Sequence, residues 1–219
     1  MNDYQYTKDE YNKNLLLNND TGYQVMMEWE KEYMKDLIEK LNPFGDVLEI
    51  GFGLGISANF IQKYNIKSHT IIECNPVVLK KLKKWAKKQK HKVIIVEDRW
   101  QDVLSSLGYF DTIFFDDTPE TNGLEGDPFD TRVYDFFHGI SNNNVKKGTR
   151  FNWFMCNDIY WLVNPFIKWD VDMKKYNVPD NCNYVKNSTL FLPLIEFKKS
   201  NLQIKKFILN NLLQLSVKT

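Results

Sequence analysis

The sequence predicts one α/β domain, in which a central, mostly parallel sheet carries helices on both faces. Short apolar runs alternate with stretches of helical periodicity, as is typical of parallel strands joined by crossover helices. A glycine-rich turn lies between the first of these runs and the helix that follows it. The 219 residues, of which 43% are hydrophobic, suffice for one sizeable core. We therefore expect a single domain over residues 1–219.

Local patterns predict the strands and helices of the core, residues 46–197. Asn75 as N-cap and Pro76 at the first helical position begin a helix that runs to about Gln89. Pro193 places the last strand at an edge of the sheet, because proline cannot donate to a ladder. The expected strands are residues 47–50, 70–73, 93–96, 110–115, 150–156 and 187–197, and a helix is expected over residues 56–64.

Amphipathic helices are expected outside this core. Residues 1–45 should form an N-terminal helical cap, because apolar side chains recur at helical spacing over residues 25–41. Residues 198–219 should form a C-terminal helix, with an apolar face over residues 202–215. This second helix packs on the domain or on another subunit, so a homo-oligomer is one possibility that the sequence leaves open.

Composition excludes several classes of function. The chain has 29 Lys and Arg against 28 Asp and Glu, so it lacks the positive field that would hold a nucleic acid. It begins without a basic and apolar leader and contains no apolar run long enough for a membrane span. Its three cysteines and three histidines have no metal-ligand spacing. We expect a cytoplasmic protein with no metal site and no nucleic-acid or membrane partner.

The glycine turn and a later acid predict an adenosyl ligand. Gly51, Gly53 and Gly55 follow the first strand in the order G-x-G-x-G, where backbone N–H groups can approach a ligand closely. Glu73 ends the second strand, where an acid can accept hydrogen bonds from both ribose hydroxyls. Trp100 follows the third strand, where the adenine should lie, although this indole could equally belong to the core.

Two carboxylates near this ligand predict a guanidino acceptor. Glu30 falls inside the apolar stripe of the 25–41 helix, four residues from both Met26 and Met34, so it must reach the rim or meet a cation. Asp116 ends the fourth strand, at the sheet edge where ligands of open α/β folds bind. Two carboxylates can grip a planar guanidinium by paired hydrogen bonds, and one of them can take its proton during methyl transfer. Asp116 is the candidate base.

These residues resemble the guanidinoacetate N-methyltransferase family and its relative, the fungal arginine N-methyltransferase. The matching stretches are residues 25–34, 48–55, 71–75, 91–94 with Trp100, and 110–116. The resemblance implies the Rossmann-like fold of class I methyltransferases. It also implies S-adenosyl-L-methionine as cofactor, S-adenosyl-L-homocysteine as product, and a small-molecule or peptide guanidino substrate.

The resemblance assigns roles residue by residue. Glu30 and Asp116 grip the guanidino group, and the backbone at Asp158 and Ile159 meets the far end of the acceptor. The N-terminal aromatic that covers the cofactor is Tyr4 or Tyr6. The residues around the cofactor are Tyr4, Met26, Met34, Gly51, Phe52, Gly53, Leu54, Gly55, Ile56, Ser57, Glu73, Cys74, Asn75, Trp100, Gln101 and Asp116.

Two departures from the family pattern bear on the acceptor. Where the family has Asp-Thr-Tyr-Pro, residues 116–119 are Asp-Asp-Thr-Pro, so an aromatic wall is lost and a charge is gained at Asp117. Asp158 stands where the family binds a carboxylate through backbone donors. A carboxylate side chain at position 158 would repel a ligand with an acid group, such as guanidinoacetate. Our hypothesis is that Asp117 or Asp158 favours arginine, agmatine or an arginine side chain in a peptide.

Two other functions remain open from the sequence. An aminopropyltransferase uses decarboxylated S-adenosylmethionine on the same fold, with acidic residues after the fourth strand, although the Glu30 helix speaks against it. A non-catalytic S-adenosylmethionine-binding scaffold is the other alternative, with the C-terminal helix as its interaction surface.

Overall fold

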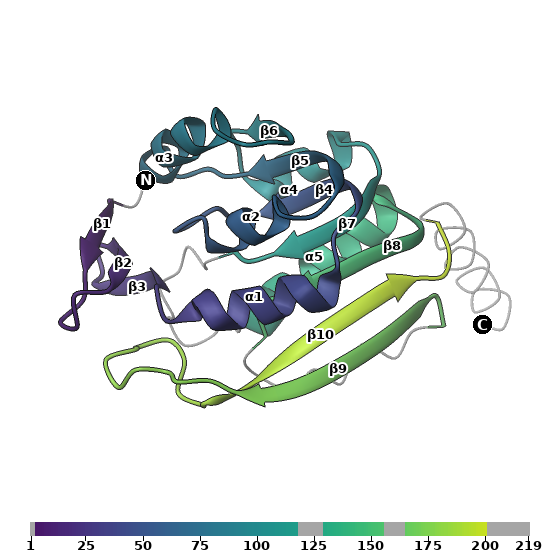
Figure 1. Cartoon of the computed structure of the whole chain (residues 1–219). Coiled ribbons are helices and arrows are strands. Elements are labelled where there is room, and N and C mark those ends of the chain that lie inside the picture. The colour runs from purple at the N-terminus through teal and green to yellow at the C-terminus, as the bar shows by residue number, and fades with distance from the viewer. Residues whose placement is uncertain (1–2, 118–128, 156–164, 201–219) are drawn as a thin grey trace, which may run out of the picture.

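A seven-stranded sheet runs through the computed structural model, which describes residues 3–117, 129–155 and 165–200. The strand order is β6-β5-β4-β7-β8-β10-β9 (Figure 1). The first five of these strands are parallel, whereas β10 is antiparallel to both of its neighbours. The strands are β4 (Gly45–Ile50), β5 (Ile66–Ile72), β6 (Lys92–Val96), β7 (Phe110–Phe115), β8 (Val145–Trp153), β9 (Ile167–Lys175) and β10 (Thr189–Phe197). The predicted α/β class with a mostly parallel sheet is confirmed.

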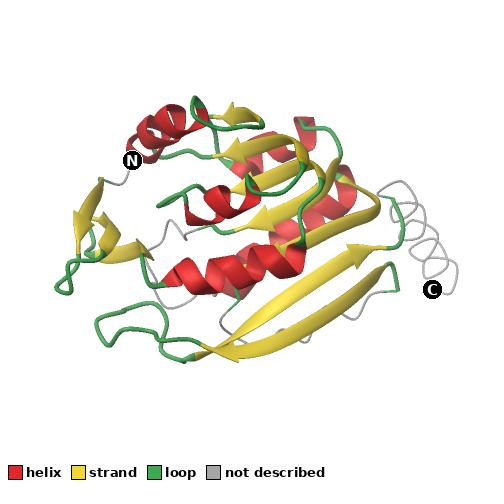
Figure 2. Ribbon diagram, viewed as in Figure 1, coloured by secondary structure: helices red, strands yellow, loops and turns green. Residues whose placement is uncertain are grey.

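Helices cover both faces of this sheet, as Figure 2 shows. One face carries α1 (Glu30–Leu41), α2 (Ile56–Ile61) and α3 (Pro76–Ala86), and the other carries α4 (Trp100–Val103), a 3-10 turn η1 (Leu104–Ser106) and α5 (Phe129–Asn143). Successive strand side chains point to opposite faces. Phe114 therefore packs in the core under α1 to α3, and Phe115 packs in the core under α4 and α5.

The start of α3 follows the sequence rule for its N-cap. The Asn75 side chain accepts hydrogen bonds from the backbone N–H groups of Val77 and Val78, so it satisfies two amides that would otherwise lack a partner. Val78 and Leu82 are buried on the inner face of the helix. The helix ends at Ala86, three residues before the expected end at Gln89.

The expected N-terminal helical cap is wrong for most of its length. Residues 4–27 form a three-stranded antiparallel sheet of β1 (Tyr4–Lys8), β2 (Asn14–Asn18) and β3 (Tyr23–Met27). Met26 and Met27 pair with Leu16 and Leu15 of β2, so the backbone of the expected first helical turn is extended. The apolar period runs across the junction of β3 and α1, and for this reason it does not mark the point where the helix begins.

The expected edge position of Pro193 is also wrong. β10 lies between β8 and β9, and Pro193 pairs with Val171 of β9. A proline is tolerated there because β10 pairs with β8 only at Ile195 and Glu196, so Pro193 lies outside the paired part of that ladder. The edge strand is β9.

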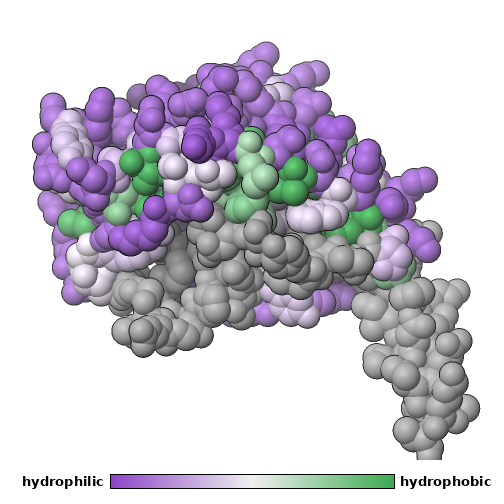
Figure 3. Space-filling view, turned by 90° about the horizontal axis from the view of Figure 1, so that it is seen from below, coloured by the Kyte–Doolittle hydropathy of each residue, from purple (hydrophilic) through white to green (hydrophobic). Residues whose placement is uncertain are grey.

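Some expectations lie outside the described residues. They concern the C-terminal helix beyond residue 200, together with Asp158 and Ile159. Across the described chain, no helix combines the length and the hydropathy that a membrane span requires. The coloured part of the face shown in Figure 3 is mostly hydrophilic, with small groups of apolar side chains among the hydrophilic ones.

Candidate active site

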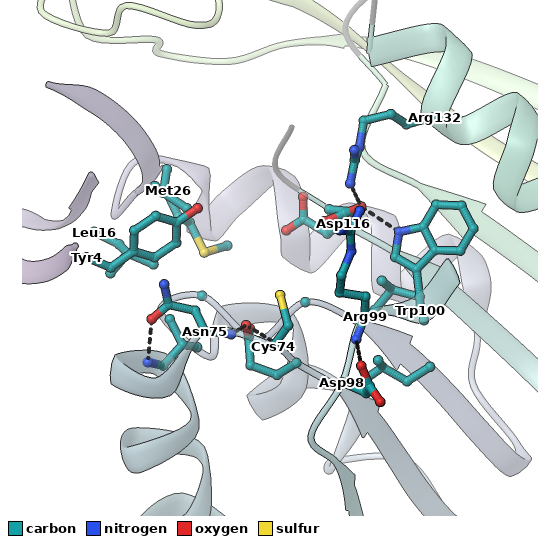
Figure 4. Close-up of a pocket in the computed structure, with 18 of the residues that line it drawn as sticks. Tyr4, Leu16, Met26, Cys74, Asn75, Asp98, Arg99, Trp100, Asp116 and Arg132 are labelled. Atoms are coloured by element: carbon teal, nitrogen blue, oxygen red, sulfur yellow. Dashed lines mark hydrogen bonds and ion pairs between the residues drawn. The ribbon is translucent and has the colours of Figure 1, made fainter. Parts of the chain in front are cut away.

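A cavity of about 630 Å³, here called the sheet-edge cavity, opens at the carboxyl ends of β4, β5, β6 and β7. The strand order reverses between β4 and β7, and ligands of open α/β sheets bind at such a point. Figure 4 shows Tyr4 and Met26 on one side of it and Asp116 and Trp100 on the other. The predicted site residues that line it are Tyr4, Met26, Gly51, Gly53, Glu73, Cys74, Asn75, Trp100, Gln101, Asp116 and Asp117.

The glycine turn brings the end of β4 against the end of β7. Gly51 has φ +80° and donates its N–H to the carbonyl oxygen of Ile72 at 3.0 Å. A Cβ atom at Gly51 would lie 2.1 Å from the backbone oxygen of Asp116. Only glycine allows both the left-handed conformation and this close approach. The close packing at Gly51 therefore helps to set the position of the Asp116 backbone beside the cavity.

The Glu73 carboxylate organises the same turn. Its Oε2 accepts the N–H of Phe52 at 3.1 Å, and its Oε1 accepts the N–H groups of Cys74 at 2.9 Å and Asn75 at 2.8 Å. Burial raises the pKa of Glu73 despite these three donors. A carboxylate has about four lone-pair sites, so Glu73 can accept a further hydrogen bond from a ligand hydroxyl.

Asp117 is paired within the protein and not free to attract a ligand. Its Oδ2 accepts the indole N–H of Trp100 at 2.6 Å and forms an ion pair with Arg132. The Arg132 side chain is 13% exposed, so this pair is largely shielded from water. The Trp100 ring packs edge-on against Phe136 with centroids 5.2 Å apart, so Trp100 both lines the cavity and belongs to the core.

Glu30 and Asp116 are two desolvated carboxylates, and the charge of Glu30 acts on Asp116. Glu30 is 2% exposed and does not line the cavity itself. Desolvation raises the pKa of Glu30 to about 7. The pKa of Asp116 is raised well above its usual value, first by desolvation and then by the negative charge of Glu30. Among the described residues, no group donates a hydrogen bond to the Asp116 carboxylate.

Two donors hold the same oxygen of Glu30 in place. Its Oε1 accepts the backbone N–H of Met27 at 2.7 Å and the hydroxyl of Tyr184 at 2.5 Å. The first contact resembles half of a capping box, in which an early helical acid reaches back three residues. It explains why a carboxylate starts α1 inside an apolar face.

The other predicted cofactor residues, which include Gly55, do not line the sheet-edge cavity. Met34 is fully buried in the core under α1 to α3. The Phe52 ring packs against Trp85, and it would be 2.7 Å from a Cβ at Gly55. Ser57 donates its hydroxyl to Glu49 at 2.5 Å. Leu54 and Ile56 line a different cavity, behind the glycine turn.

Sequence reasoning missed three residues that the structure brings to the site. Arg99 and Arg132 line the sheet-edge cavity, and Tyr184 holds Glu30. Arg132 and Tyr184 lie far from their partners in the chain, at separations of 15 and 154 residues. Arg99 lies next to Trp100 and follows β6, so its place in the sequence could have identified it as a residue of the site.

Comparison with known proteins agrees with this geometry. The family described as guanidinoacetate N-methyltransferase matches residues 2–167. Protein arginine N-methyltransferase 2 of Candida glabrata is 34% identical over 199 residues, covering 83% of this chain and 44% of the relative. Its counterpart in Saccharomyces cerevisiae is 30% identical, covering 84% of this chain and 46% of the relative. The chain thus spans less than half the length of these relatives.

Solved structures resemble the fold at low sequence identity. Spermidine synthase from Thermotoga maritima has a TM-score of 0.54 and 14% identity, covering 89% of this chain and 72% of its own. M. jannaschii TYW2 in complex with AdoMet has a TM-score of 0.55 and 16% identity, covering 91% and 88%. The fold is the Rossmann-like one of class I methyltransferases. With residues 2–167 matched, this chain belongs to the guanidinoacetate N-methyltransferase family.

Proposed function

We propose that the chain is an S-adenosylmethionine-dependent N-methyltransferase whose acceptor is a guanidino group, with arginine in a protein or peptide as the first choice. The observation that carries this proposal is the position of Asp116, whose carboxylate lines the sheet-edge cavity, with the buried Glu30 near enough for its charge to raise the pKa of Asp116. Family membership and the names of the fungal relatives support it. Family membership and these names favour a methyltransferase over an aminopropyltransferase.

The sheet-edge cavity has suitable groups for an adenosyl cofactor. Its volume of about 630 Å³ lies within the usual range for small-molecule sites. Glu73 would accept the ribose hydroxyls, Trp100 would face the adenine, and Gly51 and Gly53 would leave room beside the turn. Tyr4 and Met26 would cover the opposite side (Figure 4). The bound cofactor supplies an electrophilic methyl group on a positively charged sulfur.

A cation relieves the electrostatic cost of the acidic pair. Desolvation raises the pKa of both carboxylates, and the negative charge of Glu30 raises that of Asp116 further. A guanidinium bound between them restores both negative charges and satisfies their lone pairs through its planar N–H groups. The pair therefore selects a planar cation and orients one of its nitrogens.

The same pair supports proton removal. A guanidinium has a pKa above 12, so a base must take a proton as the new N–C bond forms. The Asp116 carboxylate has free lone pairs among the described contacts and lines the cavity. Its raised pKa makes it a stronger base than an ordinary aspartate. We assign it as the base, while Tyr184 and the backbone of Met27 keep Glu30 in place.

The choice of acceptor depends less on Asp117 than the sequence suggested. Because Asp117 is paired with Arg132, it does not present an uncompensated charge to the amino group of an acceptor. Arginine is instead the preferred acceptor because the curated relatives are named for it. Agmatine and guanidinoacetate are the alternatives that an experiment must separate.

A mass-spectrometric methylation screen tests the proposal. Purified protein is incubated with S-adenosylmethionine and, separately, an arginine peptide, free arginine, agmatine and guanidinoacetate. We expect a gain of one methyl group on a guanidino nitrogen, with the arginine acceptors turned over fastest. Preference for guanidinoacetate would overturn the choice of acceptor. Cofactor binding without methylation of any acceptor would favour the non-catalytic scaffold.

A further inference from the structure

A second cavity, also of about 630 Å³, lies on the far side of the glycine turn. Tyr6 of β1, Leu54 and Ile56 contribute to its walls, and we call it the lysine cavity after Lys31, Lys63 and Lys81, which also line it. Its lining residues come from β1, β2, α1, α2 and α3 and the segments beside them. The resemblance assigned Tyr6, Leu54 and Ile56 to the cofactor, but no role assigned above uses its three lysines.

The three lysines bring unpaired positive charge to one place. Among the residues that the structure describes, no carboxylate lies within 4 Å of any of the three ammonium groups. Lys63 and Lys81 lie over aromatic rings instead, at 4.5 Å from the Phe60 centroid and 4.0 Å from the Tyr6 centroid. These contacts hold the side chains in position but leave their charge without an anion.

Lys81 is the most restricted of the three. It is half-buried in α3, and desolvation lowers its pKa. A partly desolvated ammonium gains more from an anion than a fully solvated one does. Lys31 and Lys63 are exposed, so they can adjust to an anion that Lys81 anchors.

One acid also lines the cavity, and its lone pairs are partly engaged. Glu28 Oε2 accepts both the backbone N–H and the side-chain amide of Asn14. The lining charges are thus three positive against one negative. The apolar side chains that line the cavity are those of Leu15, Leu54, Ile56 and Phe60.

We propose that the lysine cavity is a second ligand site, which takes a small phosphate-bearing molecule with an apolar body. The phosphate lies among Lys31, Lys63 and Lys81, and the apolar body lies on Leu54 and Phe60. Such a ligand contacts the glycine turn, because Leu54 of that turn lines the lysine cavity. Tyr6, which also lines it, donates its hydroxyl to the carbonyl oxygen of Gly53 in the same turn at 2.8 Å.

Calorimetric titration with inorganic pyrophosphate at constant ionic strength tests the proposal. We expect saturable binding with one site per chain. Lys81→Met keeps the apolar stem and should weaken binding roughly 10–100-fold, as expected when a charged hydrogen-bond donor is removed. Lys63→Met, at an exposed position where a folding defect is not expected, should weaken it in the same direction.

Two control variants make the result decisive. Lys84→Met removes an exposed charge from the same helix, and it should bind pyrophosphate like the wild type. Arg99→Met removes a cation from the sheet-edge cavity, and it should also leave binding unchanged. The proposal is overturned if pyrophosphate does not saturate, if Lys84→Met weakens binding as much as Lys81→Met, or if only Arg99→Met abolishes it.

Discussion

The hydroxyl of Tyr184 donates a hydrogen bond to Glu30 Oε1 at 2.5 Å, across 154 residues of sequence. Tyr184 belongs to the segment between β9 and β10, and Glu30 starts α1. The Tyr184 ring lies 6.4 Å from that of Trp29 and 6.2 Å from that of Tyr23. The antiparallel end of the sheet thus helps to position a carboxylate beside the parallel core.

Tyr184→Phe should shift the pH profile of methylation. The hydroxyl stabilises the ionised form of Glu30 and so lowers its pKa. Without it the pKa of Glu30 rises further, and the acid limb of kcat/KM moves to higher pH, with an activity loss of about tenfold near neutrality. Tyr11→Phe, which removes an exposed hydrogen bond to Asp180, is the matched control. If the acid limb of the kcat/KM profile stays at the same pH in Tyr184→Phe, Tyr184 does not position Glu30.

Glu30→Gln should stabilise the fold above pH 7. Because burial raises the pKa of Glu30 to about 7, the folded state binds more protons than the unfolded state between the ordinary value and pH 7. The wild type therefore loses stability as pH rises through this window, whereas the glutamine does not titrate. Urea unfolding at pH 8.5 and pH 4 should show a higher midpoint for Glu30→Gln only at the higher pH. A lower midpoint at pH 8.5 would contradict the desolvation argument.

Glu73→Ala should weaken binding of S-adenosylhomocysteine by roughly 1–3 kcal/mol, since it removes a charged hydrogen-bond acceptor. It also frees the N–H groups of Phe52, Cys74 and Asn75, so some loss of fold stability should accompany it. Calorimetry gives the affinity, with the exposed Glu97→Ala as control. Affinity equal to the wild type would exclude Glu73 from the cofactor site.

Gly51→Ala should destabilise the protein more than Gly22→Ala. Both glycines have positive φ, at +80° and +71°, so alanine is strained by about 1–2 kcal/mol at either. Only at Gly51 does the added Cβ meet backbone, the oxygen of Asp116 at 2.1 Å, while at Gly22 nothing lies within 4 Å. Both variants carry the backbone strain of a positive φ, and only Gly51→Ala adds the contact with the Asp116 oxygen. The difference between their melting temperatures therefore measures the effect of this contact. Equal melting temperatures of the two variants would contradict the argument that the close approach of Gly51 to the Asp116 oxygen contributes to stability.

Sequence patterns predict the parallel core well because its strands are apolar and its turns are marked. The 110–115 strand and the Asn75 cap both match the structure. β9 carries exposed residues along most of its length, including charges at Asp170 and Lys174. An edge strand solvated in this way lacks the apolar alternation that identifies a strand.

The sequence predicts the site residues that directly follow a strand, but it does not predict contacts between segments that are distant in the chain. The turn at Gly51 and the acid at Glu73 follow strands directly, so their positions at one sheet edge follow from topology. The pairing of Asp117 with Arg132 could not be read in this way, because a single sequence does not show which cation reaches a given acid. This pairing is the reason that the cavity is less acidic than Asp116 and Asp117 together suggest.

The central claim is that Glu30 and Asp116 together bind and deprotonate a guanidino group. The most direct test is the rate of methyl transfer to an arginine peptide, followed by mass spectrometry for Glu30→Gln and Asp116→Asn. Glu39→Gln and Asp102→Asn, at exposed positions in α1 and α4, are the matched controls. We predict that both site variants lose methyl transfer by at least about 100-fold. Affinity for S-adenosylhomocysteine should stay within about tenfold of the wild type for both, and both controls should remain active. Methyl transfer at the wild-type rate by either site variant would contradict the account.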